Sequence, residues 1–488
     1  MLYQSTRGKS PAVSSTRAVL NGIAPDGGLY MPELNAAQVD YKRLLPMTAM
    51  QMAEEIFRAL LPGFEDISGI VRRAYTGKFE TDELTPLVPV GDRFVLELFR
   101  GPTSAFKDVA LSALPQFISQ ARKQEGLSEK VVILTATSGD TGKAALEGFH
   151  DVAGTQIIVF YPDGGVSAVQ RAQMVTQEGA NVRVCAVRGN FDDAQTGVKK
   201  IFANADRKLL SEMGVTLSSA NSINIGRLVP QVVYYYKAYA DLCRMGRIQP
   251  GKKADFTVPT GNFGDILAGY FAKCLGLPVG KLICASNAND VLTDFLHTGR
   301  YDRRRPFYKT ISPSMDILVS SNLERLLYLL SGCDADFVAE KMAELEQNGF
   351  YRVPQEMVAR LHEEFSAETA DDDLTTETIG KVWREHRYLC DTHTAVAWYA
   401  SEKCGGAAPN VVLSTASPYK FPAAVCRALG ASPDSDEFAV MEQLRELTGV
   451  PIPKNLAGLS ARKELHRSVV DKEKMMDYVL DAIREGKE

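Results

Sequence analysis

Lys107 is the residue of this chain best suited to covalent chemistry. It follows an apolar run that predicts a buried strand (94–99) and a short glycine–proline turn. The apolar spacing beyond it predicts a helix capped by Thr103 or Ser104, which would place Lys107 in the first helical turn. The positive end of a helix lowers the pKa of a lysine, and a neutral amine can attack a carbonyl to form a Schiff base. An ordinary surface lysine fits the same position, so the rest of the chain must decide between the two interpretations.

Three segments have the form of a predicted strand, a polar, glycine-rich loop and a helix. They are TATSGDTGK (135–143), PTGNFGD (259–265) and VVLSTAS (411–417). Hydroxyl groups, free backbone amides and a helix N-terminus can bind a carboxylate or a phosphate, and glycines let the backbone approach the anion closely. Taken singly, each segment also fits an ordinary strand-to-helix turn or a capped strand end.

One physical picture needs all four of these features, namely a Schiff-base lysine, an anion loop for a cofactor phosphate, a hydroxyl and a second anion loop. Pyridoxal 5'-phosphate (PLP) requires a Schiff-base lysine, a loop for its phosphate and a partner for its pyridine nitrogen. A nucleotide-binding P-loop is the alternative from another class of protein. It is disfavoured because the glycine spacing around Lys143 is wrong and Ala144 follows that lysine in place of Ser or Thr. The combination therefore favours a PLP-dependent enzyme.

Composition limits the other possibilities. The chain has 488 residues and a net charge of -5, which suggests about three domains and no basic field for nucleic acid or an anionic membrane. Eight scattered cysteines without a CxxC pair, and six histidines without ligand spacing, predict free thiols and no metal site. We find no apolar targeting segment and no apolar run of membrane-spanning length, so we expect a cytoplasmic protein.

Short apolar runs alternate with amphipathic stretches from residue 94 onward, which predicts βαβ units and a mostly parallel sheet. The predicted strands are 94–100, 131–137, 156–161, 182–187, 255–259, 281–285 and 410–415. Ligands of such sheets bind beyond the carboxyl ends of the strands, where the polar segments fall. The charged stretch 333–388 is expected to be a helical insertion, and 431–488 a helical C-terminal cap.

The sequence resembles the threonine synthase family in its longer, bacterial and fungal form. The matching segments are STRG (5–8), APDGGLY (24–30), GPTSAFKD (101–108), TATSGDTGKAA (135–145), NSIN (221–224), VPTGNFGD (258–265), SPSMDILVSSNLERLL (312–327), DTHTAVA (391–397) and LSTASPYKF (413–421). They span nearly the whole chain in the family's order.

The resemblance implies the α/β architecture of fold type II PLP-dependent enzymes, as in tryptophan synthase β, with open, mostly parallel sheets and flanking helices. It implies an N-terminal domain that covers the active site (1–90) and a catalytic core of two lobes (91–430, with the smaller lobe at roughly 125–225). A helical C-terminal extension (431–488) completes the chain.

The activity implied is the conversion of O-phospho-L-homoserine and water to L-threonine and phosphate, by γ-elimination followed by β-addition of water. Such an enzyme is a carbon–oxygen lyase acting on phosphates, and members of this subgroup tend to be monomers. A related phospho-lyase that releases phosphate, ammonia and 2-oxobutanoate has the same loops and stays an alternative. A PLP-binding protein without activity is disfavoured, because Lys107 and both anion loops are present.

The resemblance also assigns roles to single residues. Lys107 is the catalytic lysine that bonds to PLP, and the cofactor-binding residues besides it are Gly261, Asn262, Phe263, Asp265 and Thr415, the last as the hydroxyl partner of the pyridine nitrogen. The substrate-binding candidates are Ser138, Gly139, Asp140, Thr141, Arg171, Asn221 and Asn224. Two features depart from the family pattern: Pro115 interrupts the predicted Lys107 helix, where we expect a kink, and Ser417-Pro418-Tyr419 stands where many members carry Ala-His-Pro-Ala.

Overall fold

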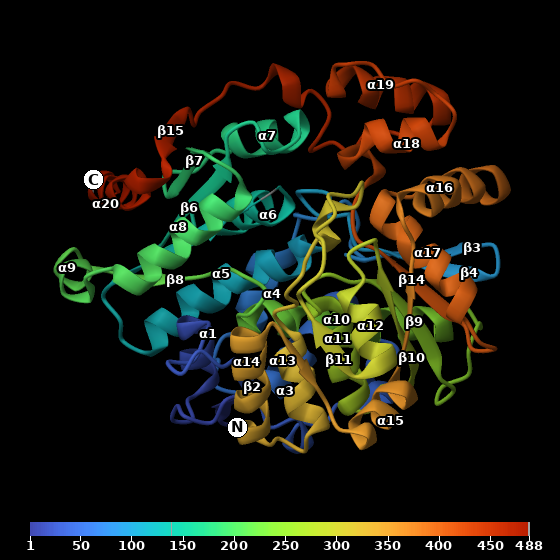
Figure 1. Ribbon diagram of the computed structural model, residues 1–488, viewed down its shortest axis with the longest axis horizontal. Coiled ribbons are helices and arrows are strands. Elements are labelled where there is room, and N and C mark those ends of the chain that lie inside the picture. Colours follow the sequence, from blue (N-terminus) through green and yellow to red (C-terminus); the bar gives the residue numbers. More distant parts are fainter. Residues whose placement is uncertain (138, 487–488) are drawn as a thin grey trace.

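The computed structural model describes residues 1–137 and 139–486. Within these residues a six-stranded sheet has the order β13-β10-β9-β14-β4-β3, and a five-stranded sheet has the order β15-β7-β6-β5-β8. The two sheets lie in separate lobes, with helix α5 (Lys107–Gln124) between them in Figure 1. Strands β3 and β4 pair antiparallel, and the other neighbours in both sheets run parallel. The expected α/β fold with mostly parallel sheets is confirmed.

All seven strands expected from the apolar runs are present. The larger sheet contains β3 (Leu87–Val90), β4 (Arg93–Glu97), β9 (Ala254–Pro259), β10 (Val279–Ser286), β13 (Phe365–Thr369) and β14 (Asn410–Ser414). The smaller sheet contains β5 (Lys130–Ala136), β6 (Thr155–Pro162), β7 (Val182–Arg188), β8 (Val215–Ser218) and β15 (Ser468–Asp471). Short antiparallel pairs join β1 (Tyr3–Ser5) to β2 (Tyr30–Pro32) and β11 (Arg300–Asp302) to β12 (Phe350–Arg352).

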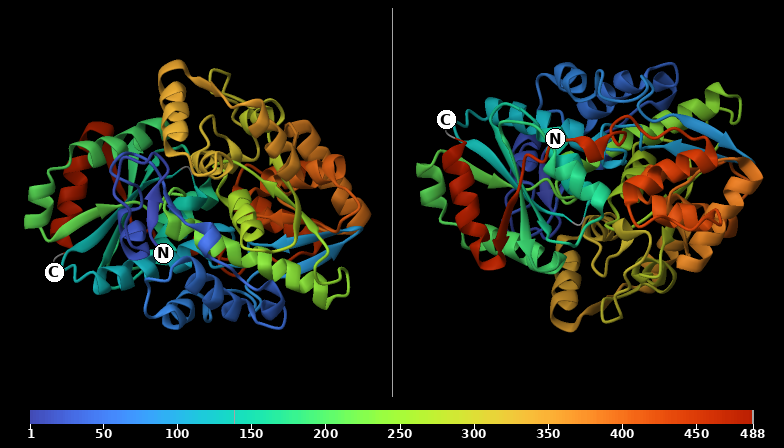
Figure 2. Two further views of the ribbon diagram at one scale, coloured as in Figure 1. Left: turned by 90° about the horizontal axis from the view of Figure 1, so that it is seen from below. Right: turned by 90° about the horizontal axis from the view of Figure 1, so that it is seen from above.

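Helices cover the two faces of each sheet (Figures 1 and 2). The α-helices besides α5 are α1 (Ser15–Asn21), α2 (Tyr41–Leu44), α3 (Ala49–Leu60), α4 (Ile67–Tyr75), α6 (Asp140–Phe149), α7 (Ala168–Val175), α8 (Phe191–Asn204), α9 (Arg207–Glu212), α10 (Ile225–Arg244), α11 (Gly264–Cys274), α12 (Val291–Thr298), α13 (Leu323–Leu330), α14 (Ala335–Asn348), α15 (Gln355–Glu364), α16 (Asp372–His386), α17 (Thr392–Cys404), α18 (Pro422–Ala428), α19 (Glu437–Thr448) and α20 (Met475–Glu485). The 3-10 helices are η1 (Leu34–Ala36), η2 (Pro313–Met315), η3 (Pro418–Lys420), η4 (Leu459–Ala461) and η5 (Lys472–Lys474).

Alternation along the strands divides the core of the larger lobe into two layers. Val412 in β14 packs in one cluster with residues of α17, whereas Val411 and Leu413 pack in another with residues of α10 and α11. Because successive side chains of a strand point to opposite faces, the sheet is buried on both sides. This double burial explains why the middle of β14 is an unbroken apolar run in the sequence.

Two stretches expected to be helical each contribute an edge strand. The stretch 333–388 contains β12 and β13, and β13 pairs with β10 at the edge of the larger sheet. The stretch 431–488 contains β15, which pairs with β7 at the edge of the smaller sheet. The sequence conceals β15 because none of its four residues is buried, so no apolar run marks it. The predicted helical insertion and purely helical C-terminal extension are wrong in this respect.

The N-terminal segment is attached to the core by buried charge. Arg7 donates to both carboxylate oxygens of Glu324 in α13, at 3.0 and 2.9 Å, and the Thr6 hydroxyl donates to the same carboxylate. Arg325, which is fully buried, donates to the carbonyl oxygens of Tyr30 and Ile223. These contacts give the family segments near the N-terminus a structural role. Figure 2 shows the N-terminal segment (blue) packed against both lobes.

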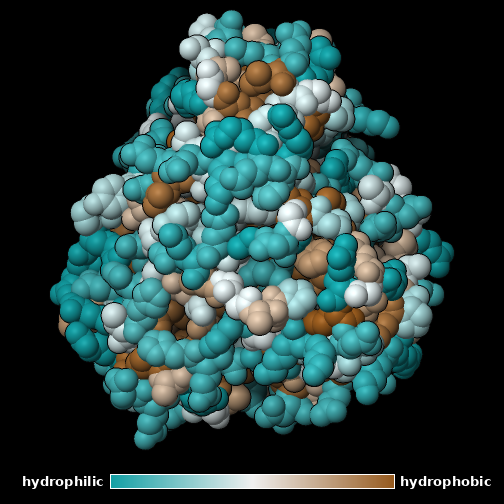
Figure 3. Space-filling view, turned by 90° about the vertical axis from the view of Figure 1, so that its right-hand side faces the viewer, coloured by the Kyte–Doolittle hydropathy of each residue, from teal (hydrophilic) through white to brown (hydrophobic). Residues whose placement is uncertain are grey.

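The C-terminal segment crosses from one lobe to the other. In Figure 1 it runs along the top of the molecule, from α19 beside the larger lobe to β15 and α20 on the smaller one. On the face shown in Figure 3, apolar side chains are scattered in small patches among polar ones. In the part of the chain that the structure describes, no helix combines the length and the apolar character needed to cross a membrane.

Helices α5 and α6 pack unusually closely at Pro115. Proline has no N–H, so the carbonyl of Leu111 loses its usual partner in α5. A Cβ added at Gly148 in α6 would lie only 1.9 Å from that carbonyl oxygen. Glycine at position 148 therefore lets the backbones of the two helices meet beside the proline.

Replacement of Gly148 by alanine is expected to destabilise the protein. The new methyl group must push α6 away from a backbone atom, which we expect to cost about 1–3 kcal/mol of unfolding free energy. Urea unfolding would measure the loss. Gly406→Ala is the matched control, because the nearest atom to its added Cβ is 3.8 Å away. Equal losses in the two variants would contradict this account.

Candidate active site

The segments that carry Lys107, Thr415 and the predicted phosphate loop meet at the carboxyl ends of three neighbouring strands. In the larger sheet β4, β14 and β9 are adjacent, and they lead into Lys107, Thr415 and the loop 260–263 respectively. The Phe106 N–H donates to the Thr415 carbonyl at 2.8 Å, and Ala105 pairs with Ala416. Lys107 and Thr415 are thus brought together by backbone pairing that continues beyond the sheet.

Helix α5 begins at Lys107, so the expected capping by Thr103 or Ser104 is wrong. Thr103 instead donates its N–H and its hydroxyl to the Asp108 carboxylate, at 2.8 and 2.5 Å. Ser104 has a φ of +60°, which turns the chain sharply before the helix. Because both Thr103 donors bond to the Asp108 carboxylate, Thr103 does not cap the helix. The helix begins at Lys107, a few residues later than the sequence predicted.

Lys107 is half-buried as a residue, and its amine, which is surrounded by protein, is available for chemistry. Among the described residues, no side chain forms a hydrogen bond or ion pair with its Nζ atom. Burial lowers the pKa of Lys107 to about 8. The charge on Asp140 opposes this shift, while Lys420 and Arg227 add to it. About a tenth of the amine is therefore neutral at pH 7, far more than for an ordinary lysine.

The loop after β9 forms a cradle of free amides. The N–H groups of residues 261–266 have no acceptor in the described part of the chain, and Leu267 is the first to bond, to the Phe263 carbonyl. Phe263 has a left-handed backbone (φ +57°), and a Cβ at Gly261 would lie 2.8 Å from the Ser314 carbonyl oxygen. Free amides at the start of an eleven-residue helix suit a phosphate group. The residues present therefore fit the phosphate of PLP.

Asn322 braces this cradle, and the sequence reasoning missed it. Its backbone N–H and its side-chain amide both donate to the Asn262 carbonyl at 3.1 Å. Ser320 donates to the Gly261 carbonyl at 2.9 Å, and Ser321 donates to the Asn262 side chain at 3.2 Å. All three of these residues lie in segment 312–327, which resembles the threonine synthase family. That resemblance was the sequence feature that could have pointed to them.

The Asp265 side chain points toward α10. Its Oδ1 accepts hydrogen bonds from the hydroxyl groups of Tyr234 at 2.5 Å and Tyr235 at 3.0 Å. Its Oδ2 is buried and has no partner among the described residues. Burial raises the pKa of Asp265 to about 7. The carboxyl group thus joins α11 to α10 and is only partly ionised near neutral pH.

The loop after β5 offers fewer free donors than the sequence suggested. Thr137 accepts the N–H groups of Gly139 and Gly142 at 3.0 and 2.9 Å, so these amides are occupied. Ser138 lies outside the described residues. Thr141 is half-buried, and we find no hydrogen bond of its hydroxyl within the ranges that the structure describes. Thr141 therefore stays a candidate for substrate binding.

The Asp140 carboxylate is bound within the protein. Lys420, whose side chain is completely buried, places its Nζ 2.7 Å from Asp140 Oδ1. Gln170 donates to the same oxygen at 3.1 Å. Burial alone would raise the pKa of Asp140, but the charges of Lys420 and Lys107 outweigh it and hold that pKa well below its usual range. The carboxylate is therefore engaged within the protein, and a role of Asp140 in substrate binding stays a prediction.

The side chains of two further substrate-binding candidates form contacts in other parts of the protein. Arg171 is ion-paired with Glu464 of the C-terminal segment, at 2.5 and 3.3 Å. Asn224 is fully buried, accepts from the Gly226 N–H at the start of α10 and donates to the Val19 carbonyl, both at 2.9 Å. Its amide is satisfied at both ends, so it serves as a helix cap and a tether to α1. Asn221 is exposed and stays a prediction.

Arg227 is the functional candidate that the sequence reasoning overlooked. It is buried in α10, and the one hydrogen bond of its side chain among the described residues runs from Nη1 to the Ala220 carbonyl at 2.8 Å. Its Nε has no partner, and no carboxylate of the described chain pairs with it. Burial lowers the pKa of Arg227 to about 10. Such a guanidinium is prepared to bind an anion. The only signal was an arginine within the apolar run IGRLVPQVV.

His393 supports the phosphate cradle from outside. Its Nδ1 lies 2.7 Å from Asp391 Oδ2, and its Nε2 accepts the Ser314 N–H at 3.1 Å. Ser314 packs against Gly261, so the imidazole holds the wall of the cradle. Ser417, where many family members carry a histidine, accepts the Tyr419 N–H at 3.3 Å and caps η3. The change at Ser417 thus leaves Thr415 in place.

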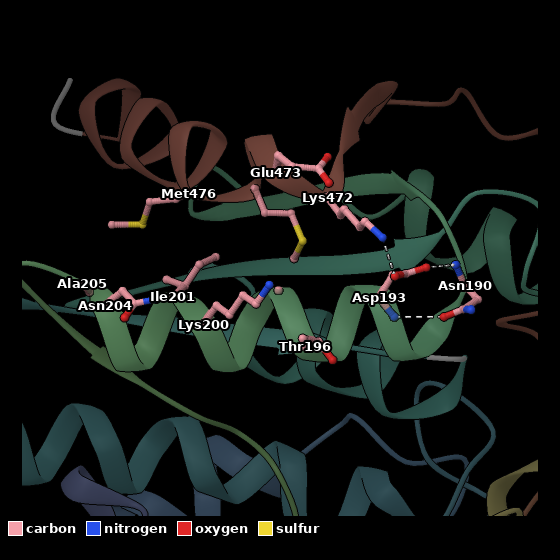
Figure 4. Close-up of a pocket in the computed structure, with 12 residues that line it drawn as sticks. Asn190, Asp193, Thr196, Lys200, Ile201, Asn204, Ala205, Lys472, Glu473 and Met476 are labelled. Carbon is pink, nitrogen blue, oxygen red and sulfur yellow. Dashed lines mark hydrogen bonds and ion pairs between the residues drawn. The ribbon is translucent and has the colours of Figure 1, made fainter.

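A separate cavity of about 510 Å³ lies between α8 and the C-terminal segment (Figure 4). Lys472 reaches across its rim to Asp193 at 3.0 Å, and Met475 and Met476 line it. The described residues around it include none of the predicted site residues. Likewise, no three His, Cys, Asp or Glu residues of the described ranges converge to hold a metal ion.

Asp265 predicts a pH dependence of stability. Because burial raises its folded-state pKa from 3.8 to about 7, the folded protein holds this proton more tightly than the unfolded chain. The resulting stability is complete below the unfolded pKa and is lost as the pH rises through about 7. The protein should therefore lose stability relative to Asp265→Asn between about pH 5 and about pH 7. Urea unfolding at fixed PLP concentration measures this, and parallel curves for the two proteins would contradict it.

Comparison with known proteins places these features in a family. Residues 82–417 match the family described as pyridoxal-phosphate dependent enzyme, residues 2–88 match threonine synthase N terminus, and residues 394–479 match threonine synthase, C-terminal. The threonine synthase of Pseudomonas aeruginosa is 40% identical, with 96% of this chain and 98% of that protein covered. The threonine synthase of Saccharomyces cerevisiae is 38% identical, with 92% and 93% covered.

A solved structure agrees over the whole chain. The PLP-bound threonine synthase from Brucella melitensis is 39% identical and has a TM-score of 0.89, with 100% of this chain and 99% of that chain covered. The lysine, the amide cradle and the parallel sheets described above fit such a cofactor. The chain therefore belongs to the threonine synthase family, PLP-dependent lyases of fold type II.

Proposed function

We propose that this chain converts O-phospho-L-homoserine and water to L-threonine and phosphate. The observation that carries the proposal is the presence of two separate anion sites beside Lys107. The amide cradle at 261–266 suits the cofactor phosphate, and Arg227 is a buried cation without a carboxylate partner in the described chain. A substrate with a phosphate of its own needs such a second site.

Lys107, Thr415 and the cradle are proposed to hold the cofactor. Lys107 would bond to it covalently, the N–H groups of the cradle would bind its phosphate, and the Thr415 hydroxyl would face its pyridine nitrogen. When bound, PLP supplies an electron sink for the substrate carbon that bears the amino group. A hydroxyl at Thr415, in place of a carboxylate, would leave the ring nitrogen mostly unprotonated.

The remaining steps belong to residues of this chain. The Lys107 amine, whose pKa of about 8 lies close to neutral pH, removes and returns protons at the substrate Cα. Arg227 binds the substrate phosphate and stabilises its charge as it leaves Cγ. The Thr141 hydroxyl and the N–H groups of Asp140 and Thr141, which Thr137 does not occupy, bind the α-carboxylate. Exclusion of bulk water by the N-terminal segment would keep the substrate bound until one water adds at Cβ.

The proposal concerns a single chain. Lys107, the amide cradle, Thr415 and Arg227 lie together within one chain, and the monomer expected from the resemblance stays a prediction. The division into an N-terminal domain (1–90), a two-lobed core (91–430) and a C-terminal extension (431–488) stays a prediction. A cytoplasmic location likewise stays a prediction from the sequence.

The products test the function directly. The purified protein is incubated with O-phospho-L-homoserine in water labelled with heavy oxygen. Phosphate and L-threonine are expected in equal amounts, with the label in the threonine hydroxyl, because water adds at Cβ. Lys107→Ala serves as the inactive control. Stoichiometric 2-oxobutanoate and ammonia would instead establish a phospho-lyase.

Arg227 should govern affinity for the substrate phosphate. Arg227→Met is expected to raise the KM for O-phospho-L-homoserine, and to weaken inhibition by inorganic phosphate, by about ten- to a hundredfold, because a charged hydrogen-bond donor is lost. Arg171→Met is the matched control and should leave both values unchanged, since Arg171 is paired with Glu464. Unchanged KM together with weakened PLP binding would assign Arg227 to the cofactor phosphate.

A further inference from the structure

We propose that Lys420 is a positioning residue for Lys107. It holds the Asp140 carboxylate in an ion pair of its own, so that the Lys107 amine stays free to bond to the cofactor. The inference rests on the proposed role of Lys107, and the experiment below separates the two.

Lys420 connects three loops of the site. Its ammonium lies 2.7 Å from Asp140 Oδ1 at the start of α6 and donates to the Thr103 carbonyl at 3.2 Å. Thr103 belongs to the turn that leads into Lys107. Lys420 itself ends η3, shortly after Thr415. Since its side chain is completely buried, its charge is not screened by solvent.

Asp140 is the acidic group most able to capture Lys107. The charged groups that act on Lys107 are Asp140 from α6, Lys420 from η3, Arg227 from α10 and Asp108 from α5, with Asp140 the strongest of the four. Asp108 is already bound by the two donors of Thr103. Asp140 also faces His393, whose Nδ1 is engaged by Asp391. Lys420 is therefore the cation that balances the charge of the Asp140 carboxylate.

Loss of Lys420 would leave a buried carboxylate without its counter-charge. Such a group pairs with the remaining cation that acts on it most strongly, which here is Lys107, and the pair favours the ammonium form of that lysine. Only the neutral Nζ has the lone pair that attacks the aldehyde carbon of PLP. In that condensation one C=N bond forms, and the aldehyde oxygen leaves as water with the two amine hydrogens. An ammonium at Lys107 blocks the first step.

The test measures covalent uptake of PLP by the full chain after its cofactor has been removed. The initial rate is followed against pH by borohydride treatment and intact-protein mass. The midpoint for the unmodified chain is expected near the Lys107 pKa of about 8. Lys420→Met should raise this midpoint by about one unit or more, because the Asp140 charge then acts on Lys107 alone. Lys420→Arg keeps the charge and should stay close to the unmodified chain.

Removal of Asp140 provides the matched control. The double variant Lys420→Met/Asp140→Asn should restore the midpoint, and Asp140→Asn alone should lower it. The single Asp140→Asn variant keeps the proposal testable if Lys420→Met fails to fold, which thermal unfolding would reveal. An unchanged midpoint in Lys420→Met or in Asp140→Asn would overturn the proposal, as would a double variant that keeps the raised midpoint.

Peptide mapping separates this inference from the proposed function. Borohydride should fix the cofactor on Lys107 in every variant that takes it up. A label on another lysine, such as Lys420 or Lys143, would overturn the assignment of Lys107, and the Lys420 proposal with it. A label on Lys107 with an unmoved midpoint would overturn the Lys420 proposal alone.

Discussion

An excess of buried positive charge is the constraint on which this site depends. Lys107, Lys420 and Arg227 are enclosed together, whereas Asp140 and Asp108 are the carboxyl groups that act on Lys107. Burial of an unpaired cation is costly, so the protein keeps Lys107 partly neutral and leaves Arg227 without a carboxylate in the described residues. Anions brought by ligands compensate for that cost. The same excess of positive charge suits the phosphate of PLP, and it supports the proposal of a phosphate-bearing substrate.

The order of the strands in the larger sheet determines which loops lie beside these buried charges. Because β14 lies between β4 and β9, the segment that carries Thr415 and Lys420 is placed between the Lys107 turn and the phosphate cradle. Parallel pairing brings the carboxyl ends of all three strands to one edge, as expected for ligand sites of open α/β sheets. Asp140 begins α6, which follows β5 of the smaller sheet. The ion pair between Lys420 and Asp140 therefore also joins the two lobes across the site.

The sequence revealed the parts of the structure that have local signatures. Buried strands appear as apolar runs, and Lys107 and the three polar loops are visible because strands and helices flank them. Arg227, Asn322 and Lys420 could not be found this way, because their importance lies in partners far away along the chain. The place of Asn224 in NSIN suggested a ligand, which stays a prediction, while its burial and its contacts with α1 and α10 could not be read from the sequence. Edge strand β15 escaped notice because it is not buried.

The bracing around the cradle explains how its amides can stay unpaired. Asn322 bonds to the Asn262 and Ser222 carbonyls and accepts from Arg325, which in turn donates to Tyr30 of the N-terminal segment. These bonds fix the loop through its carbonyl groups and leave its N–H groups free for a ligand. A loop held in this way needs little reorganisation when an anion arrives, which is the condition for strong electrostatic stabilisation. The N-terminal segment therefore contributes to the site through the backbone it fixes, without supplying a side chain to the chemistry.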